Sequence, residues 1–139
     1  MGVIDRVHVA DYGWMKKCRD GEIAGTTGES RRVEAILVRL KGDGIPEGMR
    51  VSYQAYVQDL GWQDWVWDGA TAGTEGQSHR LEGFRITLQG HLPPDTHIRY
   101  QAHVQDISWM DWVADGEVAG TPGQNRRIEA IRIRLDPDL

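Results

Sequence analysis

The strongest constraint on the fold is a segment that occurs three times in the chain. Residues 109–135 match residues 62–88, which lie 47 positions earlier, and residues 14–40, which lie a further 48 positions earlier. The three segments share one skeleton without gaps: W, then D-G, then A-G-T-x-G, then R-x-E-[AG], then alternating apolar residues ending in Leu. A period of this length indicates a repeat architecture, in which one copy cannot bury its apolar face alone.

Length and composition favour one soluble domain with many turns. The domain is expected to span residues 1–139 as three repeats, about 1–48, 49–95 and 96–139, which is long enough to bury a core. The 17 glycines favour tight turns, and the six tryptophans supply large buried or stacking surfaces. The net charge of −5 argues against nucleic-acid binding, which usually requires a basic stripe.

Sequence features also bear on the compartment. No apolar run approaches the length of a membrane span, so no membrane insertion is expected. Residues 1–9 lack the apolar core of a signal peptide, so an exported protein would carry its signal outside this chain. The only cysteine, Cys18, has Val66 and Val113 as its equivalents, so it is expected to fill a small apolar slot rather than act as a reactive thiol.

Alternating patterns predict strands at both ends of each repeat. Apolar and polar residues alternate over residues 51–58 and 98–105, whereas the first repeat has Asp5 and Arg6 where the others have tyrosine and glutamine. In the last segment Ile128 precedes Ile131 by three residues rather than two, which predicts a β-bulge near residues 129–130. Asp-Gly predicts a tight turn, and residues 120–125 predict a loop.

These patterns together predict an all-β fold. Each repeat would form a three- or four-stranded antiparallel sheet with one apolar face, and no run of helical spacing competes with this interpretation. Three such sheets can close around a pseudo-threefold axis, which hides the sheet edges. A β-prism is the preferred arrangement. A β-trefoil is the alternative, although it usually shows four well-marked strands per repeat and only three can be marked here.

The chain resembles the ChW family, the clostridial hydrophobic repeat with a characteristic Trp. The resemblance rests on Q-A-[HY]-V-Q-D-[IL]-[GS]-W and D-G-x-x-A-G-T-x-G-x-x-[RH]-R-[IL]-E-[AG]-[IF], and covers nearly the whole chain as three units. It implies an exported or cell-surface protein of a Gram-positive bacterium or relative, in which such repeats are thought to bind polysaccharide or mediate attachment. Residues 6–10 and Lys17 depart from the motif, so the first repeat is the one expected to lack a site.

The tryptophans divide into two groups with different expected roles. The first Trp of each repeat, at positions 14, 62 and 109, is always present and is expected to be core. Trp65 and Trp112 are replaced by Lys17 in the first repeat, and Trp67 also varies between repeats, so these positions are not obligatory core. Trp65 and Trp112 are therefore candidates for a platform on which a sugar ring stacks; alternatively, they cover one end of the prism.

Polar residues near these tryptophans could complete a sugar site. Neutral side chains on the outward face of the first strand could bond hydroxyl groups, although a solvated face is the alternative. The aspartates of the Asp-Gly turns lie close to the platform and also suit Asx turns. The candidate carbohydrate contacts are Trp65, Trp112, Asp68, Asp115, Gln54, Tyr56, Gln58, Gln101, His103 and Gln105.

Catalysis and cofactors are not expected. The R-x-E pairs are expected to form structural ion pairs or to brace the Gly-Thr-x-Gly loop, with a ligand role as the alternative: Arg32/Glu34, Arg80/Glu82 and Arg127/Glu129. The acidic residues recur in threes, whereas glycoside hydrolysis requires one pair of carboxylates in a cleft, and no nucleophile motif is apparent. His97 and His103 are roughly 20 Å apart along one strand and cannot share a metal ion.

The expected function is therefore a non-catalytic, lectin-like module that is secreted or lies at the cell surface. It would recognise glycans or polysaccharide through repeated sites, because weak single sites gain avidity by multiplicity. The alternative is a protein-interaction or surface-attachment module that docks a surface protein.

Overall fold

The computed structural model describes residues 1–137 as an all-β protein with three sheets. All regular elements in the described range are strands. No helix within residues 1–137 could cross a membrane. Positions 138 and 139, at the end of the third expected repeat, lie outside the described range. The predicted all-β fold with three repeated sheets is confirmed, and the choice between β-prism and β-trefoil stays a prediction.

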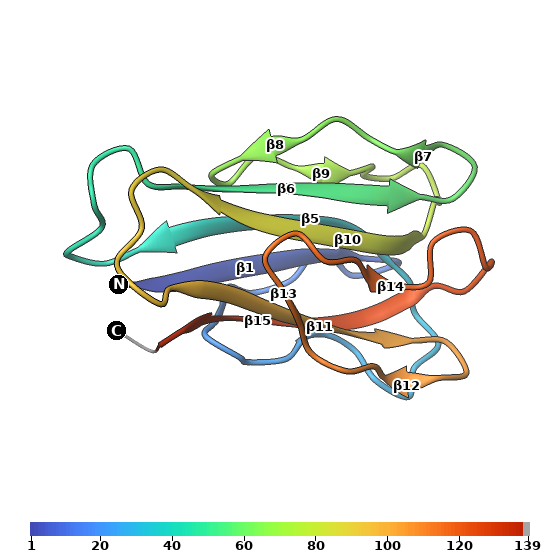
Figure 1. Ribbon diagram of the computed structural model, residues 1–139. Helices are drawn as coiled ribbons and strands as arrows, with labels where there is room; N and C mark the ends of the chain where they lie inside the picture. Colours follow the sequence, from blue (N-terminus) through green and yellow to red (C-terminus); the bar gives the residue numbers. More distant parts are fainter. Residues whose placement is uncertain (138–139) are drawn as a thin grey trace.

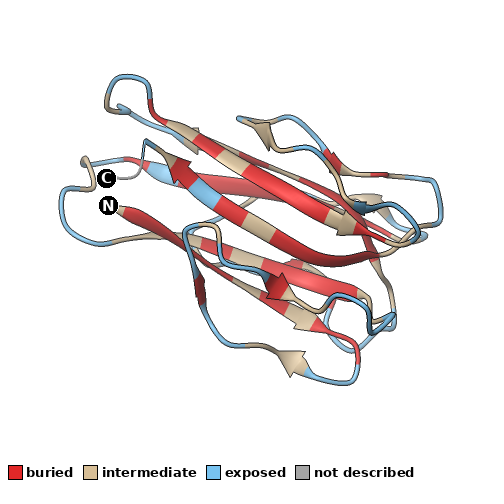
Figure 2. Ribbon diagram, turned by 90° about the horizontal axis from the view of Figure 1, so that it is seen from below, coloured by how far each residue is buried: buried red, intermediate tan, exposed pale blue. Residues whose placement is uncertain are grey.

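Each repeat contributes one pair of long antiparallel strands. The pairs are β1 (Gly2–Val9) with β5 (Val33–Lys41), β6 (Arg50–Val57) with β10 (Leu81–Gln89), and β11 (His97–Val104) with β15 (Ile128–Asp136). All three pairs run along the long direction of the molecule, and the N-terminus and the end of β15 lie at one end (Figure 1). Alternate residues of these strands face one shared apolar core, and the buried positions follow the long strands in Figure 2.

Three short strands lie between the long strands of every repeat. They are β2 (Gly13–Trp14), β3 (Cys18–Arg19) and β4 (Ala24–Gly25), then β7 (Gly61–Trp62), β8 (Val66–Trp67) and β9 (Ala72–Gly73), then β12 (Ser108–Trp109), β13 (Val113–Ala114) and β14 (Ala119–Gly120). The first two of each set pair with the preceding long strand. The third pairs with another repeat: β9 with β5, β14 with β10, and β4 with β15. This exchange closes in a ring, so each sheet has five strands rather than the predicted three or four.

A close approach between two backbones explains the glycine of each A-G-T motif. Gly73 has a φ of +104°, and a Cβ at this position would lie 2.4 Å from the carbonyl oxygen of Glu34. The next backbone N–H, from Thr74, donates to the same oxygen at 3.1 Å. Gly25 and Gly120 have equivalent contacts. Only glycine tolerates both the positive φ and the contact, so the motif is required where one repeat joins the next.

The predicted β-bulge and ion pairs occur in every repeat. The register shifts in β5, β10 and β15, so that a glutamate is the extra residue of the strand. The ion pairs are Arg32–Glu34 at 2.8 Å, Arg80–Glu82 at 2.7 Å and Arg127–Glu129 at 2.9 Å. The glutamates are buried and need this opposite charge. Glu82 also accepts a hydrogen bond from the Gly123 N–H, which gives it the expected loop-bracing role.

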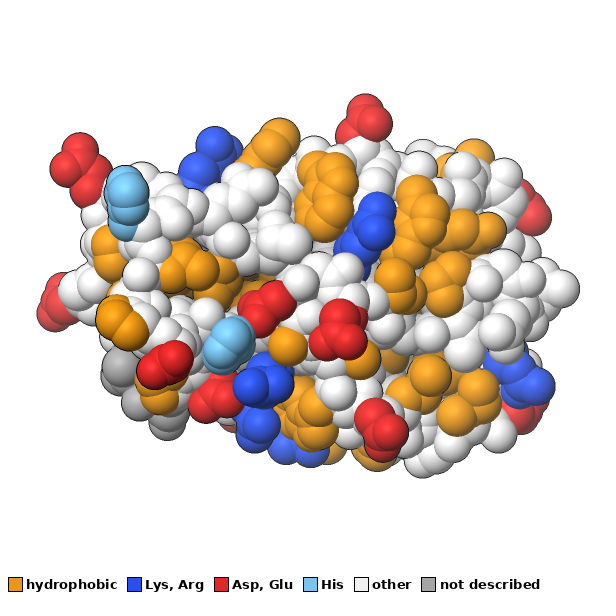
Figure 3. Space-filling view, in the orientation of Figure 1, with side chains coloured by type: hydrophobic (Ala, Val, Ile, Leu, Met, Phe, Trp, Pro, Cys, Tyr) orange, Lys and Arg blue, Asp and Glu red, His pale blue; other side chains and the backbone are white. Residues whose placement is uncertain are grey.

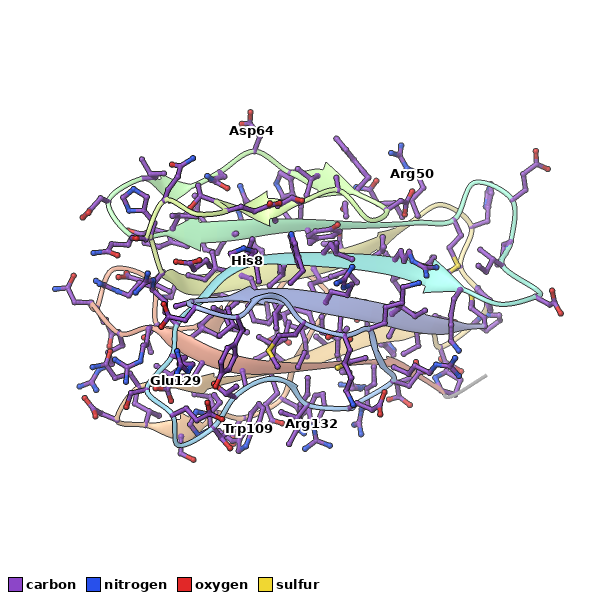
Figure 4. All side chains as sticks on the ribbon, turned by 180° about the vertical axis from the view of Figure 1, so that it is seen from behind. His8, Arg50, Asp64, Trp109, Glu129 and Arg132 are labelled. Carbon is purple, nitrogen blue, oxygen red and sulfur yellow. The ribbon has the colours of Figure 1, made fainter. Side chains whose placement is uncertain are left out.

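The first tryptophan of each repeat lies outside the core, contrary to expectation. Trp14, Trp62 and Trp109 are half-buried on the outer faces of the sheets, because the short strands pair them with outward residues of β1, β6 and β11. Each stands edge-on to its partner's ring, with centroids 5.2 to 5.5 Å apart. Figure 4 shows Trp109 beside Arg132 at the outer surface. The first tryptophan of each repeat therefore covers the outer face of its sheet instead of filling the core.

The first repeat places a carboxylate in the shared core. Tyr53 and Tyr100 are fully buried, and their hydroxyls donate to backbone carbonyl oxygens. Asp5 occupies the equivalent position and is also fully buried, yet neither carboxylate oxygen has a hydrogen-bond partner among the described residues. Burial, together with smaller contributions from the negative charges of Glu22 and Asp20, raises the pKa of Asp5 to about 8. The carboxyl group is therefore largely protonated in the folded protein at neutral pH.

The cysteine fills an apolar slot, as predicted. Cys18 is buried within the core, where Val66 and Val113 of the other repeats pack against the same core. Burial is the main cause that raises the pKa of its thiol, and the nearby Asp5 adds to the effect. The thiol is thus held in its unreactive, protonated form at neutral pH.

Candidate functional site

The candidate site lies on the outer face of the second repeat's sheet. Residues 61–67, from β7 to β8, form a short edge segment there that carries three tryptophans. Trp62 of β7 lies opposite Tyr56 of β6, and Trp67 of β8 lies opposite Ser52, near the beginning of the same strand. Between these pairings the edge segment has one residue more than β6, which shifts its alternation. Trp62, Trp65 and Trp67 consequently share the outer face, while Val66 packs against the core.

A buried glutamine holds this edge segment in place. The Nε2 of Gln54 donates to the Gln63 carbonyl oxygen, and its Oε1 accepts from Arg85 Nε, both at 2.7 Å. The Cζ of Arg85 lies 4.7 Å from the ring centroid of Trp62 and 5.2 Å from that of Trp65. These cation–π contacts orient both indoles. Asp64 lies at the crest of the segment, above this layer (Figure 4).

Trp65 and Trp67 line a hollow of about 360 Å³ together with Thr87 and Gln89 of β10. Trp67 is 40% exposed, and its indole N–H donates to Gln89 Oε1 at 3.3 Å. The Cζ of Arg50 lies 5.0 Å from the Trp67 ring centroid, which supports the indole. Figure 3 shows apolar side chains reaching the surface over this sheet, beside cationic ones. The hollow, called the aromatic hollow below, combines indole surfaces with an amide and a hydroxyl.

The third repeat builds a different surface around Trp112. The positions of the other aromatic-hollow residues, Trp67, Thr87 and Gln89, are taken in the third repeat by Ala114, Arg134 and Asp136. The Cζ atoms of Arg134 and Arg132 lie 4.5 and 5.1 Å from the Trp112 ring centroid. Two arginines therefore pack on Trp112, whereas Trp65 contacts one arginine, Arg85, and also faces the aromatic hollow.

The two candidate aspartates bond the backbone at the start of a long strand. The Oδ1 atoms of Asp68 and Asp115 each accept from a backbone N–H at 3.0 Å, that of Val51 and that of Ile98 respectively. Both aspartates have positive φ in the tight turn that the sequence predicts. The second oxygen of Asp68 lies 3.5 Å from Arg50 Nε, which connects this turn to the aromatic hollow.

The outward positions of the first strand are largely covered by the edge segments. Gln54 and Gln101 are 8% and 9% exposed, so the expectation that both face solvent is wrong. Gln101 Nε2 donates to the Met110 carbonyl oxygen, as Gln54 does at its own edge segment. Strand alternation places these amides outward, but β7–β8 and β12–β13 pack over them.

The remaining candidates are half-buried and lie nearer the far end of their strands. Gln58 and Gln105 accept hydrogen bonds from the backbone N–H groups that precede β10 and β15. Tyr56 and His103 stand edge-on to the first tryptophans, and His103 Nδ1 lies 3.0 Å from Glu129 Oε1. The predicted residues therefore do not form one continuous surface, and only Trp65 lines the aromatic hollow.

Sequence reasoning missed Thr87 and Gln89, and noted Trp67 only as a variable position. A signal was present in the comparison of repeats. The sister repeats carry charged residues at both β10 positions, namely Arg39, Lys41, Arg134 and Asp136. A neutral pair beside a variable Trp occurs in the second repeat alone.

Family comparison agrees with the repeat boundaries seen in the structure. Residues 8–42, 56–90 and 103–137 each match the family model described as Clostridial hydrophobic W. Each matched segment begins at the outward aromatic residue of the first long strand and ends just after the second long strand. No curated protein and no solved structure shows significant similarity to the chain. Because the three matches cover most of its length, the chain belongs to the ChW family as a tandem of three repeats.

Proposed function

We propose that this chain is a non-catalytic, lectin-like module that binds carbohydrate through the aromatic hollow, in a secreted or cell-surface setting. The observation that carries the proposal is the placement of Trp65 and Trp67 beside Thr87 and Gln89. The apolar face of a sugar ring stacks on an indole, and amide and hydroxyl groups bond its hydroxyls. The aromatic hollow offers both kinds of contact within one small area.

The dimensions of the aromatic hollow suit a short stretch of a sugar chain. Its volume of about 360 Å³ lies near the lower end of the range of roughly 300–1,000 Å³ for small-molecule sites. A shallow site of this size would bind weakly by itself. Useful affinity would then come from several modules acting on one polymer.

Trp67→Ala is expected to weaken glycan binding by about tenfold or more, because it removes a stacking surface. The residue lies at the exposed end of β8, so the fold should persist. A glycan array of the purified chain would first identify a ligand, and calorimetry with that glycan would then give the dissociation constants. Trp112→Ala, which removes the candidate platform of the third repeat, is the comparison variant. Loss of binding in Trp112→Ala together with full binding in Trp67→Ala would reject the aromatic hollow as the site.

The double variant Trp65→Ala/Trp112→Ala should still unfold in a single cooperative transition. Both side chains are half-buried on outer faces, where arginines pack against them. The expected loss is on the order of 1–2 kcal/mol for each residue, from apolar area and cation–π contacts. Chemical denaturation followed by near-ultraviolet circular dichroism measures this. Absence of a folded baseline would instead assign both residues to the core.

One observation favours a second candidate function, the docking of a partner protein. Tyr12, Leu60 and Ile107 occupy equivalent turn positions after β1, β6 and β11, and they are 49%, 54% and 42% exposed. Three exposed apolar side chains at one end of the molecule suit a protein contact. Free sugar should compete with ligand at the aromatic hollow but should leave protein docking intact, which separates the two functions.

A further inference from the structure

A second hollow lies where the three repeats meet, beyond the ends of β1, β6 and β11. In Figure 1 these strand ends lie opposite the N-terminus and the end of β15. It has a volume of about 670 Å³. Three sets of equivalent residues line it: Arg32, Arg80 and Arg127; Ser30, Ser78 and Asn125; Ala10, Gln58 and Gln105. We propose that this axial hollow binds a singly charged oxyanion, a carboxylate or a phosphate ester, of an acidic ligand.

The three equivalent arginines are held in fixed orientations. The Nε of each donates to its own glutamate in the adjacent bulge, at 2.8, 2.8 and 2.9 Å for Arg32, Arg80 and Arg127. A guanidinium has five N–H donors in one plane, and the glutamate takes only one edge of that plane. The arginines also line the axial hollow, so further donors remain for a ligand. Three pre-oriented guanidinium groups are a suitable receptor for an oxyanion.

The other lining groups add donors, and their two carboxylates share one arginine. The two acids of the lining, Asp11 and Glu29, both pair with Arg31, at 2.6 and 3.4 Å. Gln58 and Gln105 use Oε1 to accept from backbone N–H groups, which leaves their amide N–H donors for a ligand. The three bulge glutamates behind the arginines match their three positive charges one for one, so the directed N–H donors, rather than a net positive charge, would hold the ligand. This balance favours a singly charged group over a polyphosphate.

Differences between repeats open the axial hollow on two sides. Arg80 donates from Nη2 to Asn125 Oδ1 at 3.3 Å, which links the second repeat to the third. Serine takes the asparagine position at Ser78 and Ser30, and it is too short to make this bond. Repeat equivalence places Ser78 next to Arg32 and Ser30 next to Arg127. Arg32 and Arg127 therefore keep available for a ligand the N–H donor that, in Arg80, is bonded to Asn125.

Ser78→Asp tests the site without removing a buried ion pair. Ser78 has a φ of +57°, a conformation that aspartate adopts several times in this chain. A carboxylate at this position would pair with Arg32 and compete with the ligand, which should weaken oxyanion binding by about tenfold or more. Thr27→Glu is the charge-matched control, because residue 27 does not line the axial hollow and the second repeat carries Glu75 at its equivalent position.

Nuclear magnetic resonance of arginine Nε–Hε groups measures the binding. The folded chain would be titrated at constant ionic strength with D-glucuronate, with dimethyl phosphate, and with neutral D-glucose. We expect saturable shifts at Arg32 and Arg127 with the anions, no shifts with D-glucose, and weakening in Ser78→Asp but not in Thr27→Glu. Tighter binding of glucuronate would identify a carboxylate ligand, and tighter binding of dimethyl phosphate a phosphate ester.

Two results would overturn the proposal. One is the absence of saturable shifts with either anion, and the other is equal binding by Ser78→Asp and Thr27→Glu. The axial hollow and the aromatic hollow have no lining residue in common, so either result would leave the carbohydrate proposal untouched.

Discussion

Asp5→Asn is expected to raise the free energy of unfolding at pH 8 by about 5 kcal/mol, while leaving it nearly unchanged at pH 4. Asp5 is fully buried without a hydrogen-bond partner among the described residues, and its pKa rises from 3.8 to about 8. Between these values the unfolded chain has released the proton and the folded chain retains it. The folded state thus binds more protons, so stability is fully present below pH 3.8 and is lost as pH rises through about 8.

The measurement is urea denaturation of both chains at several pH values from 4 to 8, followed by tryptophan fluorescence. The difference between the two curves isolates Asp5, because other titrating groups contribute equally to both. Asp43→Asn, at an exposed turn, is the control and should give a small difference that does not change with pH. If the free energies of unfolding of Asp5→Asn and the unchanged chain instead vary with pH in parallel, Asp5 has the same pKa in the folded and unfolded states, and the prediction is wrong.

Gly73→Ala is expected to destabilise the chain by on the order of 4 kcal/mol, from combined backbone strain and overpacking. The added Cβ would lie 2.4 Å from the carbonyl oxygen of Glu34, at a φ of +104°. This backbone contact joins β9 of the second repeat to β5 of the first. Because neither backbone can move without breaking the strand pairing, the join between repeats would open.

Gly76→Ala provides the matched control within the same loop. Gly76 also has a positive φ, +67°, but a Cβ there would have no atom within 4 Å. Only the conformational strain remains, which is worth about 1 kcal/mol. Guanidinium denaturation measures both variants. Similar losses for the two alanines would mean that the close approach at Gly73 contributes nothing beyond its φ.

Divergence between repeats marks the aromatic hollow. The ion pairs, bulges and exchanged strands occur in all three repeats, whereas the aromatic hollow belongs to the second repeat. Trp67, Thr87 and Gln89 have no matching set in either sister. A framework built three times can therefore carry different surface chemistry on each sheet.

The sequence by itself determined the features that depend on neighbouring residues. Alternation predicted the long strands, the spacing of Ile128 and Ile131 predicted the bulge, and the R-x-E motif predicted the ion pairs. The comparison of Cys18 with two valines predicted its apolar environment. All of these features depend on residues within one strand or one repeat. Along a strand, the two-residue period decides directly which side chains share a face.

Tertiary structure decided which repeat each short strand joins and what lies over each sheet. Nothing within one repeat specifies that Ala72–Gly73 pairs with β5 of another repeat, since the contact depends on the closure of the ring. Alternation placed Gln54 outward, yet the edge segment covers it and turns it into a brace. The axial hollow likewise forms from residues about one repeat apart. The direction in which a side chain points is a local property of its strand. Whether that side chain is covered, and where a hollow forms, depends on which other segments pack against the strand.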